Sequence, residues 1–98
     1  MILKDIIEII EKEYPKNLAS EWDNVGLLVG KEESEVNRIL LALDPTLEVI
    51  QKAVEVKADL LITHHPLLFS PIKRITTKDA IGQKLFLLME HGISCYAM

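Results

Sequence analysis

The sequence predicts an α/β fold: a parallel-type sheet with crossover helices, in the order β-α-β-α-β after an N-terminal helix. Uninterrupted apolar runs at residues 39–43, 58–62 and 93–98 are typical of strands buried inside a parallel sheet. Segments with apolar residues at helical spacing separate these runs. Because 98 residues supply one modest hydrophobic core, we expect a single α/β domain over residues 1–98.

The N-terminal segment from Ile2 to Tyr14 predicts an amphipathic helix that Pro15 ends. Its apolar positions recur at helical spacing: Leu3, Ile6, Ile7, Ile10 and Tyr14. After a polar link, turn residues beginning at Trp22 lead into a short apolar run that Gly30 closes. We therefore expect a loop followed by a short strand.

The run from Ile39 to Leu43 predicts a strand covered on both faces, and it stops at Asp44. Asp44 favours the role of helix N-cap, with Pro45 at the first helical position. A role for Asp44 beside a functional site stays open. The apolar positions of the helix that follows are Leu47, Ile50, Ala53 and Val54.

The pattern then repeats, with a second strand from Ala58 to Ile62 and a helix from Asp79 to His91 that Gly92 stops. A third strand runs from Ile93 to Met98, and the crossovers between parallel strands are expected to be right-handed. Because the chain stops inside this apolar strand, we expect a fragment of a longer protein, whose last strand leaves an unpaired edge.

Composition excludes several classes of function. The formal charge is -4 and the eleven Lys and Arg residues are scattered, which does not predict a nucleic-acid-binding protein. No stretch approaches the ~20 apolar residues of a membrane span, so we expect a cytoplasmic protein with no membrane partner. The single cysteine, Cys95, forms no internal disulfide and is expected to be a buried thiol.

Metal ligation is the chemistry indicated at the strand ends. Ligands bind outside the carboxyl ends of strands in an open parallel sheet, where Asp44 and the pair His64 and His65 are expected. Neighbouring residues of a strand point to opposite faces, so the two histidines are not expected to converge on one ion, although each could hold a different ion of a pair. Pro66 restricts His65 to an extended backbone, and Thr63 is a candidate hydrogen-bond partner of the imidazoles.

Some readings stay open. A His-His pair also occurs as loop histidines satisfied by carbonyl groups. Trp22, Asp23 and Asn24 form either a capped turn anchored by the indole or a loop that covers the site. His91, in the last turn of its helix, is expected to be structural. Gly26 and Gly30 do not complete either common phosphate-binding glycine loop.

Three motifs in order resemble those of one family over nearly the whole chain. They are the segments from Ser20 to Leu27, from Leu41 to Thr46 and from Ala58 to Leu67. Together they resemble the amino-terminal half of the NGG-interacting-factor-three-like family, the GTP cyclohydrolase I type 2 homologues. The resemblance implies a domain that is half of a larger one.

The resemblance also implies a dinuclear centre of two divalent metal ions, zinc, iron, manganese or nickel, to which His64 and His65 contribute. The family's other ligands would lie beyond residue 98, so this chain alone is expected to bind metal weakly. The implied function is a metal-dependent hydrolase of a nucleotide, phosphoester or pterin-like small molecule. The alternative is a non-catalytic, metal-binding scaffold, and the family implies a ring-like homo-oligomer.

Overall fold

The computed structural model describes residues 1–15, 24–68 and 70–98. Its helices and strands follow the predicted order, with most bounds within two residues of those expected. They are α1 (Leu3–Glu13), β1 (Gly26–Val29), β2 (Ile39–Ala42), α2 (Leu47–Glu55), β3 (Leu60–Thr63), α3 (Ala80–Glu90) and β4 (Ser94–Ala97). The α/β fold class is therefore confirmed.

The strands form one sheet in the order β1-β4-β3-β2. The three strands β2, β3 and β4 pair in parallel, as predicted, while β1 pairs antiparallel with β4. The expectation that the last strand leaves an unpaired edge is wrong, because β4 lies between β1 and β3. The sheet is thus mixed: the short strand predicted before Gly30 is β1, and its antiparallel pairing at the edge was not predicted.

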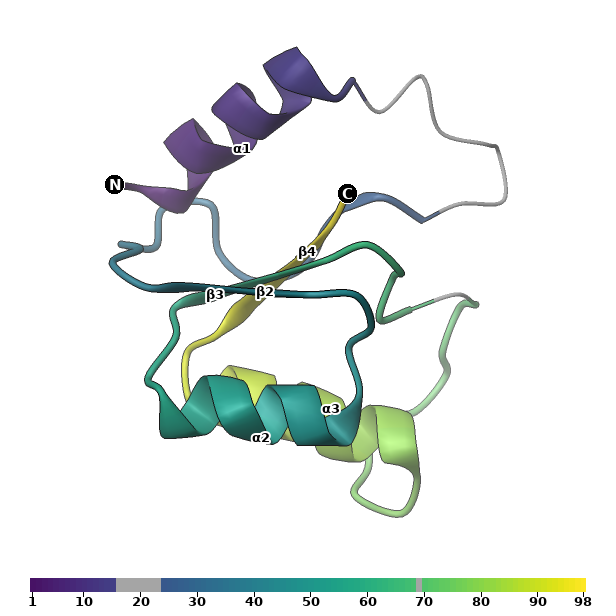
Figure 1. Ribbon diagram of the computed structural model, residues 1–98. Coiled ribbons are helices and arrows are strands. Elements are labelled where there is room, and N and C mark those ends of the chain that lie inside the picture. Colours follow the sequence, from purple (N-terminus) through teal and green to yellow (C-terminus); the bar gives the residue numbers. More distant parts are fainter. Residues whose placement is uncertain (16–23, 69) are drawn as a thin grey trace.

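Helices cover both faces of the sheet (Figure 1). The face of α2 and α3 encloses the larger core, in which Ile50, Leu61 and Leu88 are buried. The face of α1 encloses a smaller core around Leu3 and Tyr96. All residues of the two inner strands, β3 and β4, are buried, so these strands form the centre of the sheet. No helix in the described ranges is long and apolar enough to cross a membrane.

Backbone hydrogen bonds hold α1 against the loop that precedes β2. The amide of Leu3 donates to the carbonyl of Ser34, and that of Lys4 donates to the carbonyl of Glu32, each at 2.8 Å. These carbonyls satisfy amide groups at the helix start that have no partner within the helix. The hydroxyl of Tyr96 on β4 donates to the Glu11 carboxylate at 3.1 Å. Burial, and then the charge of Glu11, raises the pKa of Tyr96 to about 12.

The ends of the later helices correct one prediction. Thr46, not Asp44, is the N-cap of α2, because the Thr46 hydroxyl accepts the amide of Val49 at 3.1 Å and the helix begins at Leu47. Asp79 caps α3 by accepting the amide of Gly82, and Gly92 ends it in a left-handed conformation, as predicted. Asp44 is therefore free for another role.

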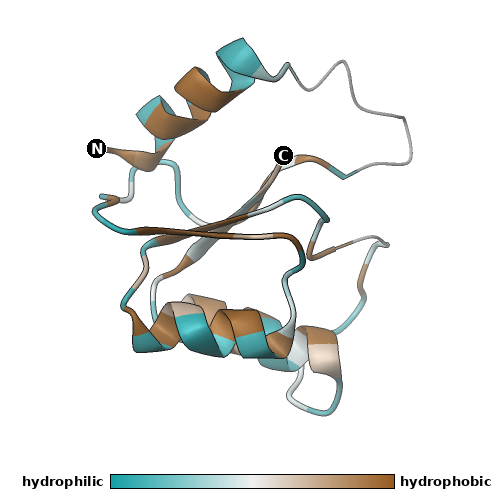
Figure 2. Ribbon diagram, viewed as in Figure 1, coloured by the Kyte–Doolittle hydropathy of each residue, from teal (hydrophilic) through white to brown (hydrophobic). Residues whose placement is uncertain are grey.

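The expectation that the Ile39–Leu43 run is covered on both faces is also wrong. Leu40 and Ala42 pack toward the larger core, whereas Leu41 is 71% exposed and Leu43 is 62% exposed. Leu41 pairs with Ile62 of β3, which belongs to the core on the face of α1. On that face α1 leaves Leu41 and Leu43 uncovered, and Figure 2 shows that β2 is coloured as hydrophobic.

Gly82 provides the first test of the packing. A Cβ at this position would lie 1.6 Å from the Thr76 carbonyl oxygen, so the loop before α3 fits only against a glycine. We expect Gly82→Ala to lower the free energy of unfolding by more than about 2 kcal/mol. Gly92→Ala, whose Cβ meets nothing within 4 Å, is expected to cost about 1 kcal/mol through its φ of 63°. Urea denaturation measures the free energy of unfolding of both variants. Equal losses of stability in the two would contradict this prediction.

Cys95 provides a second test, because its side chain is fully buried in the larger core. Burial raises the pKa of the Cys95 thiol to about 12, so almost no thiolate exists at pH 8. We expect a thiol reagent such as 5,5′-dithiobis(2-nitrobenzoic acid) to leave the native chain unmodified at pH 8 and to react once in denaturant. Rapid reaction of the native chain would contradict this burial.

Candidate metal centre

The parallel register of β2 and β3 brings the candidate ligands to one rim of the sheet. Ala42 pairs with Thr63 at the carboxyl ends of the two strands, and the chain continues from there into Asp44 and His64. The carbonyl oxygen of Leu43 then accepts two amides, from His64 at 3.2 Å and from His65 at 3.0 Å. The backbone of the histidine pair is thus held beside the residue that precedes Asp44.

Asp44 meets His65 directly. The Nδ1 atom of His65 lies 2.5 Å from the Oδ1 atom of Asp44, and both side chains are half exposed. Because a carboxylate accepts and does not donate, Nδ1 carries the proton, which leaves Nε2 of a neutral ring as the nitrogen with a free lone pair. A carboxylate that orients a histidine in this way is the usual partner of a metal-ligating imidazole.

The two histidines lie side by side. Their ring centroids are 4.9 Å apart and their planes are inclined at 54°. The expectation that they point to opposite faces is therefore wrong, because β3 ends at Thr63 and strand alternation no longer applies to the bend that follows. Both imidazoles are exposed at the same rim.

Other predicted site residues hold the backbone around this pair. The buried hydroxyl of Thr63 donates to the carbonyl of His65 at 2.6 Å, not to an imidazole as expected. The Asn24 amide donates to the carbonyl of Leu68 at 2.7 Å and so ties the segment before β1 to the loop after the histidines. Trp22 and Asp23, the other two candidates in that segment, lie outside the described residues.

The donors at this rim fit a metal in kind but not in number. Imidazole nitrogens suit zinc, iron, nickel and related cations. Across the described ranges, however, no three His, Cys, Asp or Glu side chains gather closely enough to hold an ion. Two imidazoles and one orienting carboxylate make part of a coordination sphere, and the remaining ligands must come from elsewhere.

A cavity of about 630 Å³ opens beside His65, between the starts of α2 and α3. Asp44 and His65 line it together with Lys84 of α3 and the apolar side chains of Leu67 and Ile81. Lys84 is half buried and has no ion-pair partner among the residues described. The sequence reasoning missed Lys84. A helix that follows a strand starts near the rim where that strand ended. Lys84 lies five residues after the N-cap Asp79, and this position was the sequence signal that could have found it.

His91 lies at the opposite end of the sheet. It is the C-cap of α3, and it lines a small cavity with Asp59 and Ile93 at the amino ends of β3 and β4. Its position separates it from the other two histidines.

The fold and the rim define an α/β protein with polar groups gathered at the carboxyl ends of its parallel strands. The chain belongs to the Duf34/NIF3 (NGG1p interacting factor 3) family, which it matches over residues 1–98. It is 50% identical over 97 residues to a GTP cyclohydrolase 1 type 2 homolog of Clostridium perfringens, covering 99% of this chain and 37% of that one. It is 48% identical to the homolog of Methanocaldococcus jannaschii, covering 99% and 39%.

Solved structures agree with the family. Reduced HcgD from M. jannaschii superimposes with a TM-score of 0.93 at 47% identity, over all of this chain and 39% of that one. The Staphylococcus aureus protein SA1388 superimposes with a TM-score of 0.95 at 38% identity, over all of this chain and 32% of that one. The chain thus spans about two fifths or less of the length of these relatives.

Asp44 and Thr46 provide a paired test of the rim. We expect Asp44→Ala to remove the preference of His65 for the Nδ1-protonated tautomer, because the acceptor of that proton is lost. Thr46→Ala should cost about 1 kcal/mol of stability through the lost cap and leave the tautomer unchanged. Two-bond nitrogen-proton NMR correlations of the ring read the tautomer, and urea denaturation reads the stability. An unaltered His65 ring in Asp44→Ala would show that Asp44 does not orient it.

Proposed function

We propose that the protein containing this chain binds two divalent metal ions, with His64 and His65 as two of the ligands, and acts as a metal-dependent hydrolase. The proposed substrate is a nucleotide, a phosphoester or a pterin-like small molecule. The observation that carries the proposal is the pairing of His65 with Asp44 beside a second exposed imidazole at the carboxyl rim of a parallel sheet.

The arrangement of the two rings supports a pair of ions. Asp44 accepts the proton on Nδ1 of His65, so Nε2 is the nitrogen that a neutral ring offers for ligation. The imidazole of His64 stands next to it and has no hydrogen-bond partner in the described part of the chain. Two imidazoles with centroids 4.9 Å apart suit neighbouring ions, such as the two ions of hydrolytic sites that lie about 3.5–4 Å apart.

The cavity beside His65 supports a substrate with an anionic group. Lys84 offers an ammonium group there, while Leu67 and Ile81 supply apolar surface on which a flat ring can rest. Small-molecule sites combine such apolar walls with a few charged groups. When bound, divalent cations would supply Lewis acidity toward an oxygen of the substrate. In this proposal Lys84 binds the anionic group, and Asp44 keeps His65 oriented.

One observation favours the alternative of a non-catalytic, metal-binding scaffold. The strip of Ile39, Leu41 and Leu43 on β2 is apolar and exposed. Such a surface is typical of an interface with another chain or another part of the same protein. In this reading the metal pair stabilises an oligomer, and the ring-like homo-oligomer implied by the family is the functional unit.

The test of metal binding is elemental analysis of this chain and of a longer form that includes the residues its relatives have beyond it. All proteins are purified without chelators. We expect about two metal ions per longer chain and few in the 98-residue chain, because two imidazoles leave most of each coordination sphere to water. Changing both His64 and His65 to Ala should remove the metal from the longer form.

His91→Ala is the matched control, because His91 is an exposed histidine at the other end of the sheet, and it should keep the full metal content. Metal-dependent turnover that the double variant loses and His91→Ala keeps would support the hydrolase. Tight metal binding without turnover of any phosphoester or cyclic substrate would favour the scaffold. Absence of metal from every form would overturn the proposed centre.

A further inference from the structure

A second cavity lies at the end of the sheet opposite the candidate metal centre. It has a volume of about 450 Å³ and lies between the end of β1, the loop that follows it, and the turn from α3 into β4. Because β1 runs antiparallel to β4, its end at Val29 lies beside the amino end of β4, where Ser94 is located. None of the residues proposed for the metal centre lines this cavity.

Ser94 is the unusual residue of the cavity. It is only 3% exposed, and within the residues that the structure describes its hydroxyl has no hydrogen-bond partner. Among the described residues, every side-chain polar atom that is fully buried has a hydrogen-bond partner. The Ser94 hydroxyl has none, so it is not fully buried and borders the cavity. A hydroxyl at the wall of a cavity can hydrogen-bond to a molecule that fills the cavity, as donor or as acceptor. The hydroxyl is therefore positioned for a ligand.

Gly30 keeps this hydroxyl accessible. A Cβ at position 30 would lie 2.3 Å from the Oγ atom of Ser94, and the φ of Gly30 is 140°, in a region that other residues rarely adopt. Any side chain at this position would occupy the space in front of the hydroxyl. The close approach of β1 and β4 at Gly30 thus leaves Ser94 open toward the cavity.

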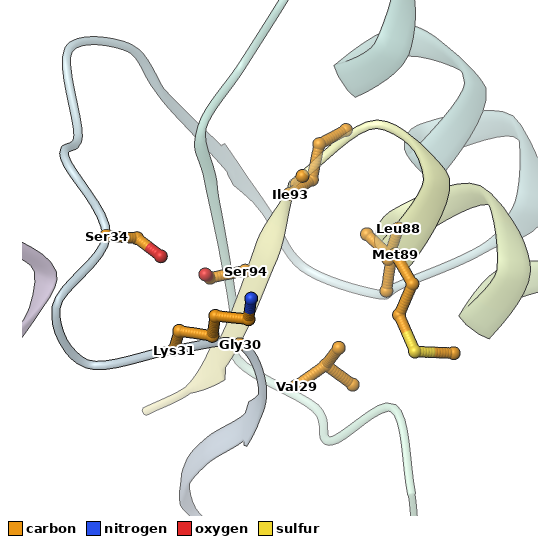
Figure 3. A pocket seen from close by; sticks show the side chains of 9 residues that line it. Val29, Gly30, Lys31, Ser34, Leu88, Met89, Ile93 and Ser94 are labelled. Carbon is orange, nitrogen blue, oxygen red and sulfur yellow. The ribbon is translucent and has the colours of Figure 1, made fainter.

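Two further donors face the same space. Figure 3 shows the Lys31 side chain and the Ser34 hydroxyl directed toward Ser94 from the neighbouring loop. The turn that carries them is fixed, because the Ser34 amide donates to the Lys31 carbonyl at 3.0 Å and the Ser34 carbonyl accepts from α1. Acidic residues of the same loop, Glu32 and Glu33, do not line the cavity. The ammonium group of Lys31 only donates hydrogen bonds, so a ligand beside it must offer a hydrogen-bond acceptor.

The opposite wall is apolar. Val29, Leu88, Met89 and Ile93 form it, and Figure 3 shows their side chains across the cavity from the three donors. A ligand that matches both walls carries an anionic group at one end and a short apolar body at the other. We propose that this cavity binds a small carboxylate with a short aliphatic tail, with its carboxylate on Lys31, Ser34 and Ser94 and its tail against the apolar wall.

The probe for this site is butyrate, titrated into the ¹⁵N-labelled 98-residue chain and followed by heteronuclear NMR. We expect saturable shifts confined to the amides of residues 29–34 and 88–94. Butyramide has nearly the same shape but no charge, and it should bind about tenfold more weakly because hydrogen bonds to a charged group are the stronger ones. Saturable shifts elsewhere, or equal affinity for the two probes, would overturn the proposal.

Two variants locate the contact. Ser94→Ala should weaken butyrate binding about tenfold, and Lys31→Gln, at an exposed position, about fivefold. Ser70→Ala and Lys73→Gln are the matched controls in the exposed loop before α3 and should bind as the wild type does. If Ser94→Ala perturbs folding, Lys31→Gln still decides the question. Unchanged affinity in Lys31→Gln would show that the site is elsewhere, and no saturable binding at all would reject it. Neither result bears on the metal content used to test the proposed function.

Discussion

The parallel pairing of β2 with β3 is the constraint on which the site depends. Asp44 and His65 are separated by 21 positions in the sequence, yet the register of Ala42 with Thr63 sets the ends of the two strands side by side. Parallel strands need a crossover between them, and α2 supplies it while filling the larger core. The contact between a carboxylate and an imidazole is thus a consequence of backbone pairing, and a slip of register would separate them.

The central strand β3 carries this constraint because it is buried on both faces. Leu61 faces the core beneath α2 and α3, whereas Leu60 and Ile62 face the core beneath α1. The two helical layers therefore hold one strand from opposite sides. Only its end remains accessible, so the residues that follow Thr63 are the first that can present polar groups to a ligand.

The two ends of the sheet present different surfaces. At the carboxyl rim, exposed imidazoles and the Asp44 carboxylate suit a cation, and Lys84 stands beside them in a cavity. At the other end, Lys31 and the buried Ser94 offer donors to a cavity that no acidic side chain of the described residues lines. The loop of Lys31 is also the loop whose carbonyls satisfy the start of α1. Packing of α1 and shaping of this second cavity are therefore coupled through the same few residues.

Periodicity and turn residues were enough to determine the helices, the three parallel strands and the place of His64 and His65, because these depend on local patterns of burial and backbone conformation. Gly92 and Pro15 marked helix ends for the same reason. Local pattern did not determine which side chain caps α2, and it misassigned Asp44, because Asp44 and Thr46 are both good caps. Nor did it show that Leu41 is exposed, since an apolar run does not reveal how far a helix extends over a sheet. The antiparallel place of β1, the side-by-side histidines and the open hydroxyl of Ser94 depend on contacts between distant segments, and only the tertiary structure decides those.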